Sequence, residues 1–323
     1  MYKSLFLFLL YILYIDHLIL LLFYLLNSDK IQSGDNMNDY LQKAYCMNQT
    51  VRIYAAVTTN TVLHAEEIFN MWPTSTSALG RVLTIAAIMS CTYKNDDYLT
   101  IKVLGDGPIG KIIVGANDGK VRGFCENPGV QLTKNVGSLA LELAVGNGEL
   151  EVIKDLHLRQ PFKSSIELVS GNITEDFTYY FAKSEQIPSS VGRGVAFYSN
   201  NKVKAAGGFL IQVMPGCKDE DIQKLEDKLA NLKSCSTMID LGYTPEDIIN
   251  EITDGDYQLL ETKELKYECT CSKERFEKGL ISLGKDELLT ILNEDHKAEI
   301  NCNFCNKKYT FSEDDLKNII EKL

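Results

Sequence analysis

The sequence contains 323 residues, of which 45% are hydrophobic and 24% charged, with 44 acidic against 33 basic side chains. This apolar content excludes a disordered chain, and nine cysteines are too few for a disulfide-stabilised miniprotein. A formal net charge of -11 argues against a protein that coats nucleic acid, because phosphate binding needs a surplus of Lys and Arg. The length suffices for one sizeable core and one or two smaller units.

Residues 1–36 form an apolar N-terminal extension. Within it, residues 5–26 are interrupted only by Asp16 and His17. The apolar side chains outweigh the roughly 3 kcal/mol cost of a central Asp, so this segment, if translated, is expected to enter a membrane as a helix. It is a poor signal peptide, because the run is too long and no A-x-A cleavage site follows. The alternative, which we favour, is that residues 1–36 lie upstream of the true start and Met37 opens the folded protein.

Residues 37–216 are predicted to form a mixed α/β core with several strands. Alternating hydrophobicity indicates a half-buried strand over residues 98–104, and the glycines and proline of residues 105–108 indicate a turn after it. Further strands are expected at residues 111–114, 120–125, 150–154, 164–169 and 202–213.

Two helices are predicted in the same core. Ser75 or Thr76 is expected to cap a helix that continues to Met89 and is apolar on nearly all sides, which indicates a buried helix. A second helix is expected over residues 177–186, ending before Pro188.

Residues 217–265 form an acidic segment that begins after the turn-forming Pro215-Gly216. Residues 217–264 hold 13 acidic and 5 basic residues, a net charge of -8, which is most often a solvated helical face. Apolar side chains nevertheless recur at helical spacing, at Ile222, Leu225, Leu229 and Leu232 and again, after a helix start at residues 244–247, at Ile248, Ile249 and Ile252. Short acidic helices of this kind need another surface to pack on.

Two close cysteine pairs in residues 266–323 carry the strongest chemical signal. Cys269 and Cys271 form a C-x-C pair, and thirty residues later Cys302 and Cys305 form a C-x2-C pair. Four thiolates suit one tetrahedral zinc ion, with Zn–S distances of about 2.3 Å. A unit of under 60 residues buries little core, so a structural zinc is favoured over unrelated thiols.

The surroundings of the four cysteines indicate a thiolate-rich site without hydrolytic chemistry. Cys271 precedes Ser272, a predicted helix cap, and the positive end of that helix favours a thiolate. A capping box at residues 312–315 predicts a final helix. The site has no open ligand position and no nearby base, but it can be oxidised, which makes it a potential switch. Nearby cations that can offset its negative charge are Lys266, Lys273, Arg275, Lys307 and Lys308.

A series of short motifs runs in order from Trp72 to Cys305. They are WPTS at residues 72–75, GDGPIG at 105–110, FTYY at 177–180, SEQIPSSVG at 184–192, AAGGF at 205–209, MPG at 214–216, CTCSKERF at 269–276 and CNFC at 302–305. In these motifs the chain from Met37 onwards resembles the Hsp33 family of redox-regulated holdase chaperones. The resemblance implies an α+β protein with a substrate-holding core (37–216), a redox-sensitive helical linker (217–265) and a zinc-binding redox-switch domain (266–323).

The resemblance also implies a mechanism and its residues. The zinc ligands correspond to Cys269, Cys271, Cys302 and Cys305, which bind one ion in the reduced, inactive protein. Oxidation is implied to form the disulfides Cys269–Cys271 and Cys302–Cys305, to release zinc, to unfold the linker and to permit homodimerisation. The activated form would hold unfolding client proteins without ATP and without being an enzyme. The stripe from Ile222 to Leu232 is our hypothesis for a surface that is buried when reduced and freed when oxidised.

Other expectations follow from departures from the family and from the remaining cysteines. Residues 1–36 have no family counterpart, and a membrane helix fits poorly with a cytoplasmic oxidant sensor, so we expect no membrane partner unless residues 1–36 are translated. Nucleic acid is not expected as a partner. Cys217 and Cys235 lie outside the zinc set of the family; they could add a disulfide in the linker, but we expect them to be spectator thiols. The cysteines expected to be buried and inert are Cys46, Cys91 and Cys125.

Two alternative functions remain open from the sequence. One is a thiol-disulfide oxidoreductase that uses Cys302 and Cys305. The other is a plain zinc-ribbon binding module, for which oxidation would change no function.

Overall fold

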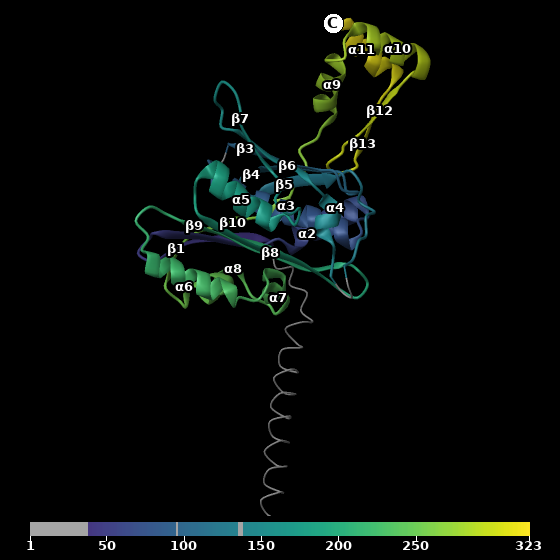
Figure 1. Cartoon of the computed structure of the whole chain (residues 1–323). Coiled ribbons are helices and arrows are strands. Elements are labelled where there is room, and N and C mark those ends of the chain that lie inside the picture. The colour runs from purple at the N-terminus through teal and green to yellow at the C-terminus, as the bar shows by residue number, and fades with distance from the viewer. Residues whose placement is uncertain (1–37, 95, 135–137) are drawn as a thin grey trace, which may run out of the picture. The chain divides into compact units, whose positions relative to one another are not determined.

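The computed structural model describes residues 38–94, 96–134 and 138–323. The apolar extension predicted at residues 1–36 lies outside the described residues. Asp39 to Leu323 form one compact unit that combines helices with three sheets (Figure 1), which confirms the mixed α+β class. Across the part of the chain that is described, no helix is long and apolar enough to cross a membrane.

A five-stranded antiparallel sheet has the strand order β10-β1-β2-β9-β8. Its strands are β1 (Tyr40–Cys46), β2 (Val51–Val57), β8 (Ser189–Phe197), β9 (Val203–Val213) and β10 (Tyr257–Glu264). Only β9 was expected from the sequence. The segment that forms β2 is nearly continuously apolar because both of its faces are buried, so it shows no alternation of polar and apolar residues.

A six-stranded sheet has the order β11-β5-β4-β3-β6-β7 and is antiparallel except between β11 and β5. Its strands are β3 (Tyr98–Gly105), β4 (Lys111–Asn117), β5 (Lys120–Cys125), β6 (Gly148–Asp155), β7 (Phe162–Glu167) and β11 (Lys266–Tyr267). The predicted strands at residues 98–104, 111–114, 120–125 and 150–154 are confirmed. The strand predicted at 164–169 lies two residues earlier.

The central helix α3 (Pro73–Ser90) packs against both sheets and is buried along almost its whole length. The predicted cap at Ser75 or Thr76 is wrong, because the helix begins at Pro73 with Trp72 as its N-cap. Proline suits the first helical position, where its missing N–H leaves no hydrogen bond unmade. The Ser75 hydroxyl instead donates to the Asn127 carbonyl at 3.0 Å.

Three further helices and a π-helical turn complete the core. They are α2 (Thr59–Phe69), α4 (Leu141–Val145), α5 (Thr174–Tyr180) and η1 (Phe181–Glu185). The helix predicted over residues 177–186 begins three residues earlier than expected and ends in the π-helical turn, before Pro188.

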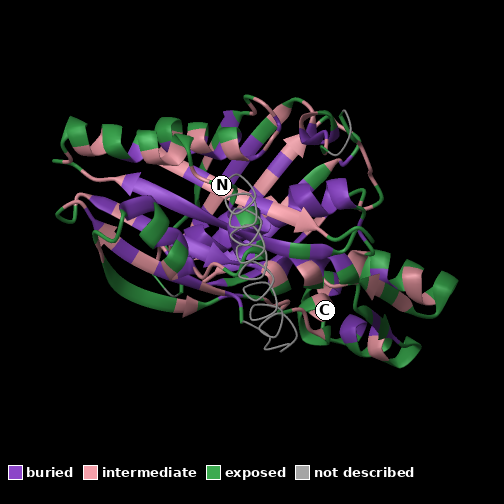
Figure 2. Cartoon of the chain, turned by 90° about the horizontal axis from the view of Figure 1, so that it is seen from below, coloured by how far each residue is buried: buried purple, intermediate pink, exposed green. Residues whose placement is uncertain are grey.

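The two faces of the five-stranded sheet are buried by different partners. In β2, Tyr54 and Ala56 pack with α3 on what we call the inner face, whereas Ile53 and Ala55 lie on the opposite, outer face. The outer face is covered by α6 (Asp219–Ala230), α7 (Cys235–Asp240) and α8 (Pro245–Thr253), which we call the outer cover (Figure 1). In Figure 2 the strands are largely buried, and the helices at the periphery show buried and exposed stripes.

The apolar stripes predicted in the acidic segment do pack on the sheet. Leu225 is buried in the same cluster as Ile53, with Leu229 and Leu232 packed against it. The helix start at Thr244 is a capping box, in which the Thr244 hydroxyl accepts from the Asp247 N–H at 3.2 Å and the Asp247 carboxylate accepts from the Thr244 N–H at 2.9 Å. The acidic run is therefore a set of amphipathic helices with one buried side.

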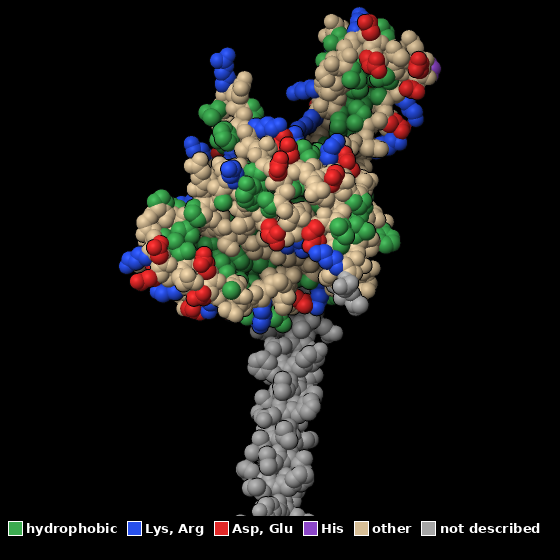
Figure 3. Space-filling view, in the orientation of Figure 1, with side chains coloured by type: hydrophobic (Ala, Val, Ile, Leu, Met, Phe, Trp, Pro, Cys, Tyr) green, Lys and Arg blue, Asp and Glu red, His purple; other side chains and the backbone are tan. Residues whose placement is uncertain are grey.

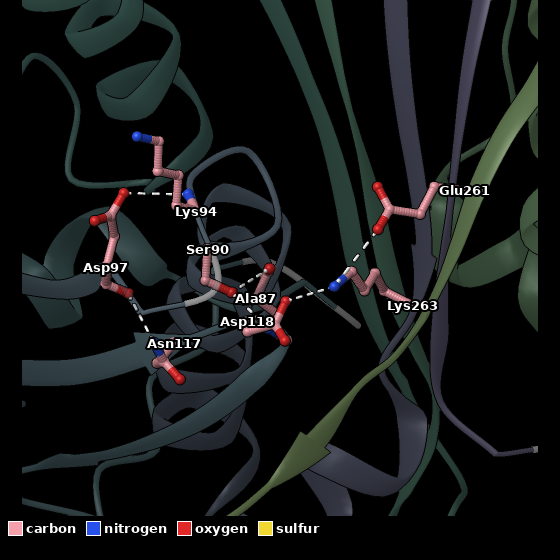
Figure 4. Close-up of polar contacts among 9 residues, drawn as sticks. Ala87, Ser90, Lys94, Asp97, Asn117, Asp118, Glu261 and Lys263 are labelled. Atoms are coloured by element: carbon pink, nitrogen blue, oxygen red, sulfur yellow. Dashed lines mark hydrogen bonds and ion pairs between the residues drawn. The ribbon is translucent and has the colours of Figure 1, made fainter. Parts of the chain in front are cut away.

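The last part of the acidic segment is a strand, which the sequence did not predict. β10 pairs with β1 and so extends the five-stranded sheet. Lys263 of β10 forms ion pairs with Asp118, in the turn between β4 and β5, at 2.8 Å and with Glu261 at 3.5 Å (Figure 4). β10 is therefore connected to both sheets.

Residues 269–323, which we call the C-terminal module, have a small core of their own. The module contains α9 (Lys273–Ile281), α10 (Lys285–Asp295), the hairpin strands β12 (Ala298–Asn301) and β13 (Lys308–Phe311), and α11 (Glu313–Glu321). Leu280, Leu288, Phe311 and Leu316 are among its buried side chains. The predicted capping box at Ser312 is confirmed, since Ser312 and Asp315 exchange hydrogen bonds at the start of α11.

Candidate metal centre

The four cysteines singled out from the sequence lie together in the C-terminal module. Cys269 and Cys271 precede α9, and Cys302 and Cys305 lie in the loop that joins β12 to β13. All four Sγ atoms are within 4.8 Å of one another, and they form the only group of three or more potential metal ligands among the described residues.

The sulfur spacing suits a tetrahedral metal ion. The Sγ–Sγ distance is 3.7 Å between Cys269 and Cys302 and 3.4 Å between Cys271 and Cys305. A tetrahedral ion with metal–sulfur bonds of about 2.3 Å places sulfurs about 3.8 Å apart. The four thiols are therefore arranged to hold one metal ion, and soft sulfur ligands in this number are typical of zinc.

The hairpin loop that carries Cys302 and Cys305 is a tight backbone turn. The Asn301–Lys308 pair closes the hairpin, and the Cys302 carbonyl accepts from the N–H groups of Cys305 at 3.3 Å and Asn306 at 2.8 Å. Asn306 adopts φ 55°, a left-handed conformation that asparagine tolerates well. The turn thus brings both thiols to one site.

The surroundings of Cys271 lower the pKa of its thiol. Ser272 caps α9 as predicted, accepting from the Arg275 N–H at 3.2 Å, so Cys271 lies at the positive end of the helix. Burial opposes ionisation, but hydrogen bonds from the Tyr309 hydroxyl and the other thiols lower the pKa of Cys271 to about 7. Tyr309 lies 3.1 Å from the Cys271 sulfur. No sequence pattern singled out Tyr309 as a partner of Cys271.

Burial raises the pKa of both hairpin thiols, Cys302 and Cys305. Burial thus favours the neutral form of the two hairpin thiols, in contrast to Cys271, whose pKa is lowered. Metal binding has to displace the protons of these two thiols.

Three of the five cations expected to offset the site's charge form ion pairs with carboxylates. Their pairs are Lys266 with Glu268 at 2.9 Å, Lys273 with Asp315 at 2.8 Å and Lys308 with Glu299 at 2.5 Å. A sixth cation contacts the cysteine loops directly, and it comes from strand β5 of the core. Arg122, only 8% exposed, donates from Nη1 to the Thr270 hydroxyl at 3.2 Å.

Arg122 also faces Cys269. Burial opposes its charge, but Tyr98 and Cys269 raise the pKa of the guanidinium. No sequence pattern links Arg122 to the cysteines, because it lies 148 residues from Thr270.

The remaining cysteines lie away from this site. Cys46, Cys91 and Cys125 are buried as expected, and burial raises the pKa of each thiol to about 12. Cys235 is likewise buried, with its pKa raised to about 12, whereas Cys217 is partly buried against the outer cover's cluster. All nine cysteines carry free thiols.

Comparison with known proteins decides the family. The family model described as Hsp33 protein matches residues 39–312. The chain belongs to the Hsp33 family. The 33 kDa chaperonin of Bacillus cytotoxicus is 47% identical over 291 residues, covering 89% of this chain and 100% of the relative. That of Bacillus subtilis is 45% identical over 284 residues, covering 87% and 98%.

A solved Hsp33 structure has the same fold. The crystal structure of the 33 kDa chaperonin from Thermotoga maritima superposes with a TM-score of 0.82 at 33% identity, covering 88% of this chain and 98% of that one. The Hsp33 resemblance inferred from the sequence is therefore confirmed. The relatives are named chaperonins, which agrees with a chaperone and gives no sign of an enzyme.

Proposed function

We propose that this Hsp33 chain is an ATP-independent holdase that oxidation of Cys269, Cys271, Cys302 and Cys305 switches on. The observation that carries the proposal is the outer face of the five-stranded sheet. This face is apolar, and its cover consists of three short helices in an acidic segment that leads directly, through β10 and β11, to the four thiols.

The outer face has the chemistry that an unfolding protein would bind. It presents Ile53, Phe209 and Ile211 from neighbouring strands β2 and β9, all buried under the outer cover. Exposing a contiguous apolar surface of this kind creates a binding site for other apolar chains. In the reduced protein this surface is closed, so the holdase is inactive.

In the reduced form, one zinc ion held by the four thiolates supplies a structural cross-link for the C-terminal module. Oxidation by a peroxide converts Cys269 with Cys271, and Cys302 with Cys305, into two disulfides. Four electrons pass from the sulfurs to two peroxide molecules, which take up four protons and leave as four waters. The sulfurs then no longer serve as ligands, and zinc is released.

Loss of this cross-link is expected to destabilise the C-terminal module, because its own core is small. β11 and β10 then lose their anchor, and the outer cover detaches from the sheet. The oxidised protein forms a homodimer, in which the uncovered outer faces hold clients. A protein whose switch depends on reduced thiols belongs in the cytoplasm.

Nucleic acid is not a partner in this proposal. The net charge is -11, and the face seen in Figure 3 has Lys and Arg side chains interspersed with Asp and Glu. A phosphate-binding surface needs clustered basic side chains.

The test is light scattering of a heat-unfolding client mixed with the full chain, without nucleotide. Reduced zinc-loaded protein is compared with peroxide-treated protein, and Cys217→Ser serves as a control that keeps the four thiols. Suppression of aggregation by the oxidised form alone is expected. Equal suppression by both forms would contradict redox control, and suppression by neither would contradict the holdase. Turnover of a disulfide substrate that Cys302→Ser abolishes would instead favour an oxidoreductase.

A further inference from the structure

Each cysteine pair presents an intervening residue to the core. Thr270 lies between Cys269 and Cys271, and Phe304 lies between Cys302 and Cys305. Both side chains meet the same guanidinium, that of Arg122 on β5. We propose that Arg122 is a positioning residue that holds the two cysteine loops together against the core, and thereby sets how firmly the reduced protein retains zinc.

The guanidinium of Arg122 makes contacts in two directions. Toward the C-terminal module, Nη1 donates to the Thr270 hydroxyl at 3.2 Å, and the guanidinium carbon lies 4.7 Å from the centroid of the Phe304 ring. Toward the core, Nε and Nη2 donate to the Tyr98 hydroxyl at 3.2 and 3.0 Å. The Tyr98 contacts fix the orientation of the planar group, so Arg122 presents a rigid fork to both loops.

Neighbouring groups reinforce the same docking contact. Phe124 lies on the same side of β5 as Arg122, and its ring meets Phe304 edge to face with centroids 5.3 Å apart. The Tyr267 hydroxyl hydrogen-bonds the carbonyls of Gly123, at 2.9 Å, and Phe304. The hairpin loop is thus held at the Phe304 side chain by β5 and at the Phe304 backbone by Tyr267 of the neighbouring strand β11.

Arginine suits this place better than another cation would. A buried guanidinium costs free energy unless its donors are satisfied and its faces are packed, and here Tyr98, Thr270 and Phe304 do both. Arg122 also brings positive charge to a cluster of four thiolates without relying on Lys266, Lys273 and Lys308, which are paired with carboxylates.

The contacts of Arg122 can couple a movement of the cysteine loops to the outer cover. Any rearrangement of the cysteine loops that moves Thr270 and Phe304 leaves the buried Arg122 with Nη1 unpaired and one face of its guanidinium unpacked, which is unfavourable. β11 pairs with β5 beside Arg122, through Lys266 with Lys120 and Tyr267 with Val121. Loosening that pairing frees the end of β10 and the helices that precede it. This last step rests on the proposed function.

The test compares three variants of the full chain in the reduced, zinc-loaded form. Arg122→Met removes both the positive charge and the planar set of N–H donors. Arg122→Lys keeps the positive charge alone, and Lys120→Met is the matched control. Lys120 lies on the same strand and its amine pairs only with Glu268, at 3.0 Å, within the contacts of the described residues. Zinc released by a fixed dose of peroxide is followed with a chromophoric chelator. Amide exchange of the outer cover is measured on the same samples, without a client.

Arg122→Met is expected to release zinc about tenfold faster than the wild type and to speed exchange in α6–α8. Arg122→Lys should fall between the two, because charge alone does not reproduce the fork. Lys120→Met should stay within about twofold of the wild type. Equal rates for Arg122→Met and the wild type would overturn the proposal, and so would an equal effect of Lys120→Met.

A second variant distinguishes loss of the Arg122–Phe304 contact from a folding defect in β5. Phe304→Leu removes the partner from the C-terminal module and leaves the core strand intact. If Arg122 acts through Phe304, the two substitutions together should speed zinc release by less than the product of their separate effects, whereas fully independent effects would multiply and would contradict the proposal. Because no client is present, these rates also stand apart from the holdase test. Faster zinc release without any holdase activity would support the role of Arg122 and contradict the proposed function.

Discussion

The two faces of the five-stranded sheet are both apolar but are covered by different kinds of helix. The inner face packs on α3, an 18-residue helix of which Arg81 is the only residue not buried. The outer face packs on α6, α7 and α8, which have 12, 6 and 9 residues. In α6, Leu225 is the only buried side chain. Helices this short are marginal without tertiary contacts, so the outer cover depends on the sheet, whereas α3 is part of the core itself.

This difference indicates which part of the molecule can open while the rest stays folded. Local stability follows the amount of buried apolar contact, so the outer cover is expected to detach at a lower free energy than α3. The outer cover is also the part that the chain connects to the four thiols, through β10 and β11. The predictions below test this contrast, beginning with the largest effect.

Removing zinc is expected to have the largest effect. Cys302→Ser takes away one of four ligands, and structural zinc sites contribute on the order of 10 kcal/mol to the folding of small domains. The C-terminal module and α6–α8 should lose amide protection in the reduced variant, while α3 keeps its own. Hydrogen exchange followed by mass spectrometry checks this. Equal loss of protection in α3 would mean that α3 and the outer cover do not open independently.

A cavity in the outer cover is expected to activate the protein without oxidant. Ile249→Ala in α8 removes a fully buried side chain, at a cost of about 2–5 kcal/mol, and weakens packing on the outer face. Leu83→Ala in α3 makes a comparable cavity in the core and serves as the matched control. Reduced Ile249→Ala should suppress client aggregation, and reduced Leu83→Ala should not, when both are assayed below their unfolding temperatures. Similar behaviour of the two variants would contradict the expected difference between the outer cover and α3.

Loss of the α8 cap should have a smaller effect. Thr244→Ala removes the hydroxyl that accepts from the Asp247 N–H, which costs about 1 kcal/mol, or roughly fivefold in local opening. Amide exchange in α8 should therefore quicken about fivefold. Ser312→Ala removes the equivalent cap of α11 in the C-terminal module, and it should quicken exchange in α11 alone. An unchanged α8 would show that packing on the sheet, rather than the cap, limits its opening.

The smallest effect is expected at the ion pair between β10 and the other sheet. Lys263 and Asp118 are partly exposed, and pairs of this kind contribute about 0–1 kcal/mol. Lys263→Met should lower the urea midpoint slightly, and a double-mutant cycle with Asp118→Asn isolates the pair. A coupling well above 1 kcal/mol would make this pair, rather than strand pairing with β1, the main attachment of β10.

Sequence patterns identified β3, which has one less buried side, and also β9, which is buried along nearly its whole length. β3 alternates between polar and apolar residues because one of its sides is less buried, and it was predicted almost to the residue. β2 is covered on both sides and was missed, and β10 was missed because it lies in an acidic run that indicates helix or solvent. Periodicity reports how many sides of an element are buried, and it cannot say what buries them.

The residues of the candidate site were likewise predicted only in part. Cysteine spacing singled out all four thiols, because metal ligands in small modules come from short local loops. The nearby cations were also visible in the sequence, yet three of them pair with carboxylates. Arg122 was not visible, since nothing in its own strand marks it as a neighbour of the cysteines.

The sequence by itself determined the Hsp33 family, the four thiols and the amphipathic character of the acidic helices, because each is written in residues that are close together along the chain. Only the tertiary structure decided that those helices cover the outer face of the sheet, that Tyr309 hydrogen-bonds Cys271, and that Arg122 contacts both cysteine loops. The physical reason is that these contacts join residues brought together by strand pairing and packing. The geometry of the folded chain decides which residues meet, and that geometry cannot be inferred from the residues adjacent to them in the sequence.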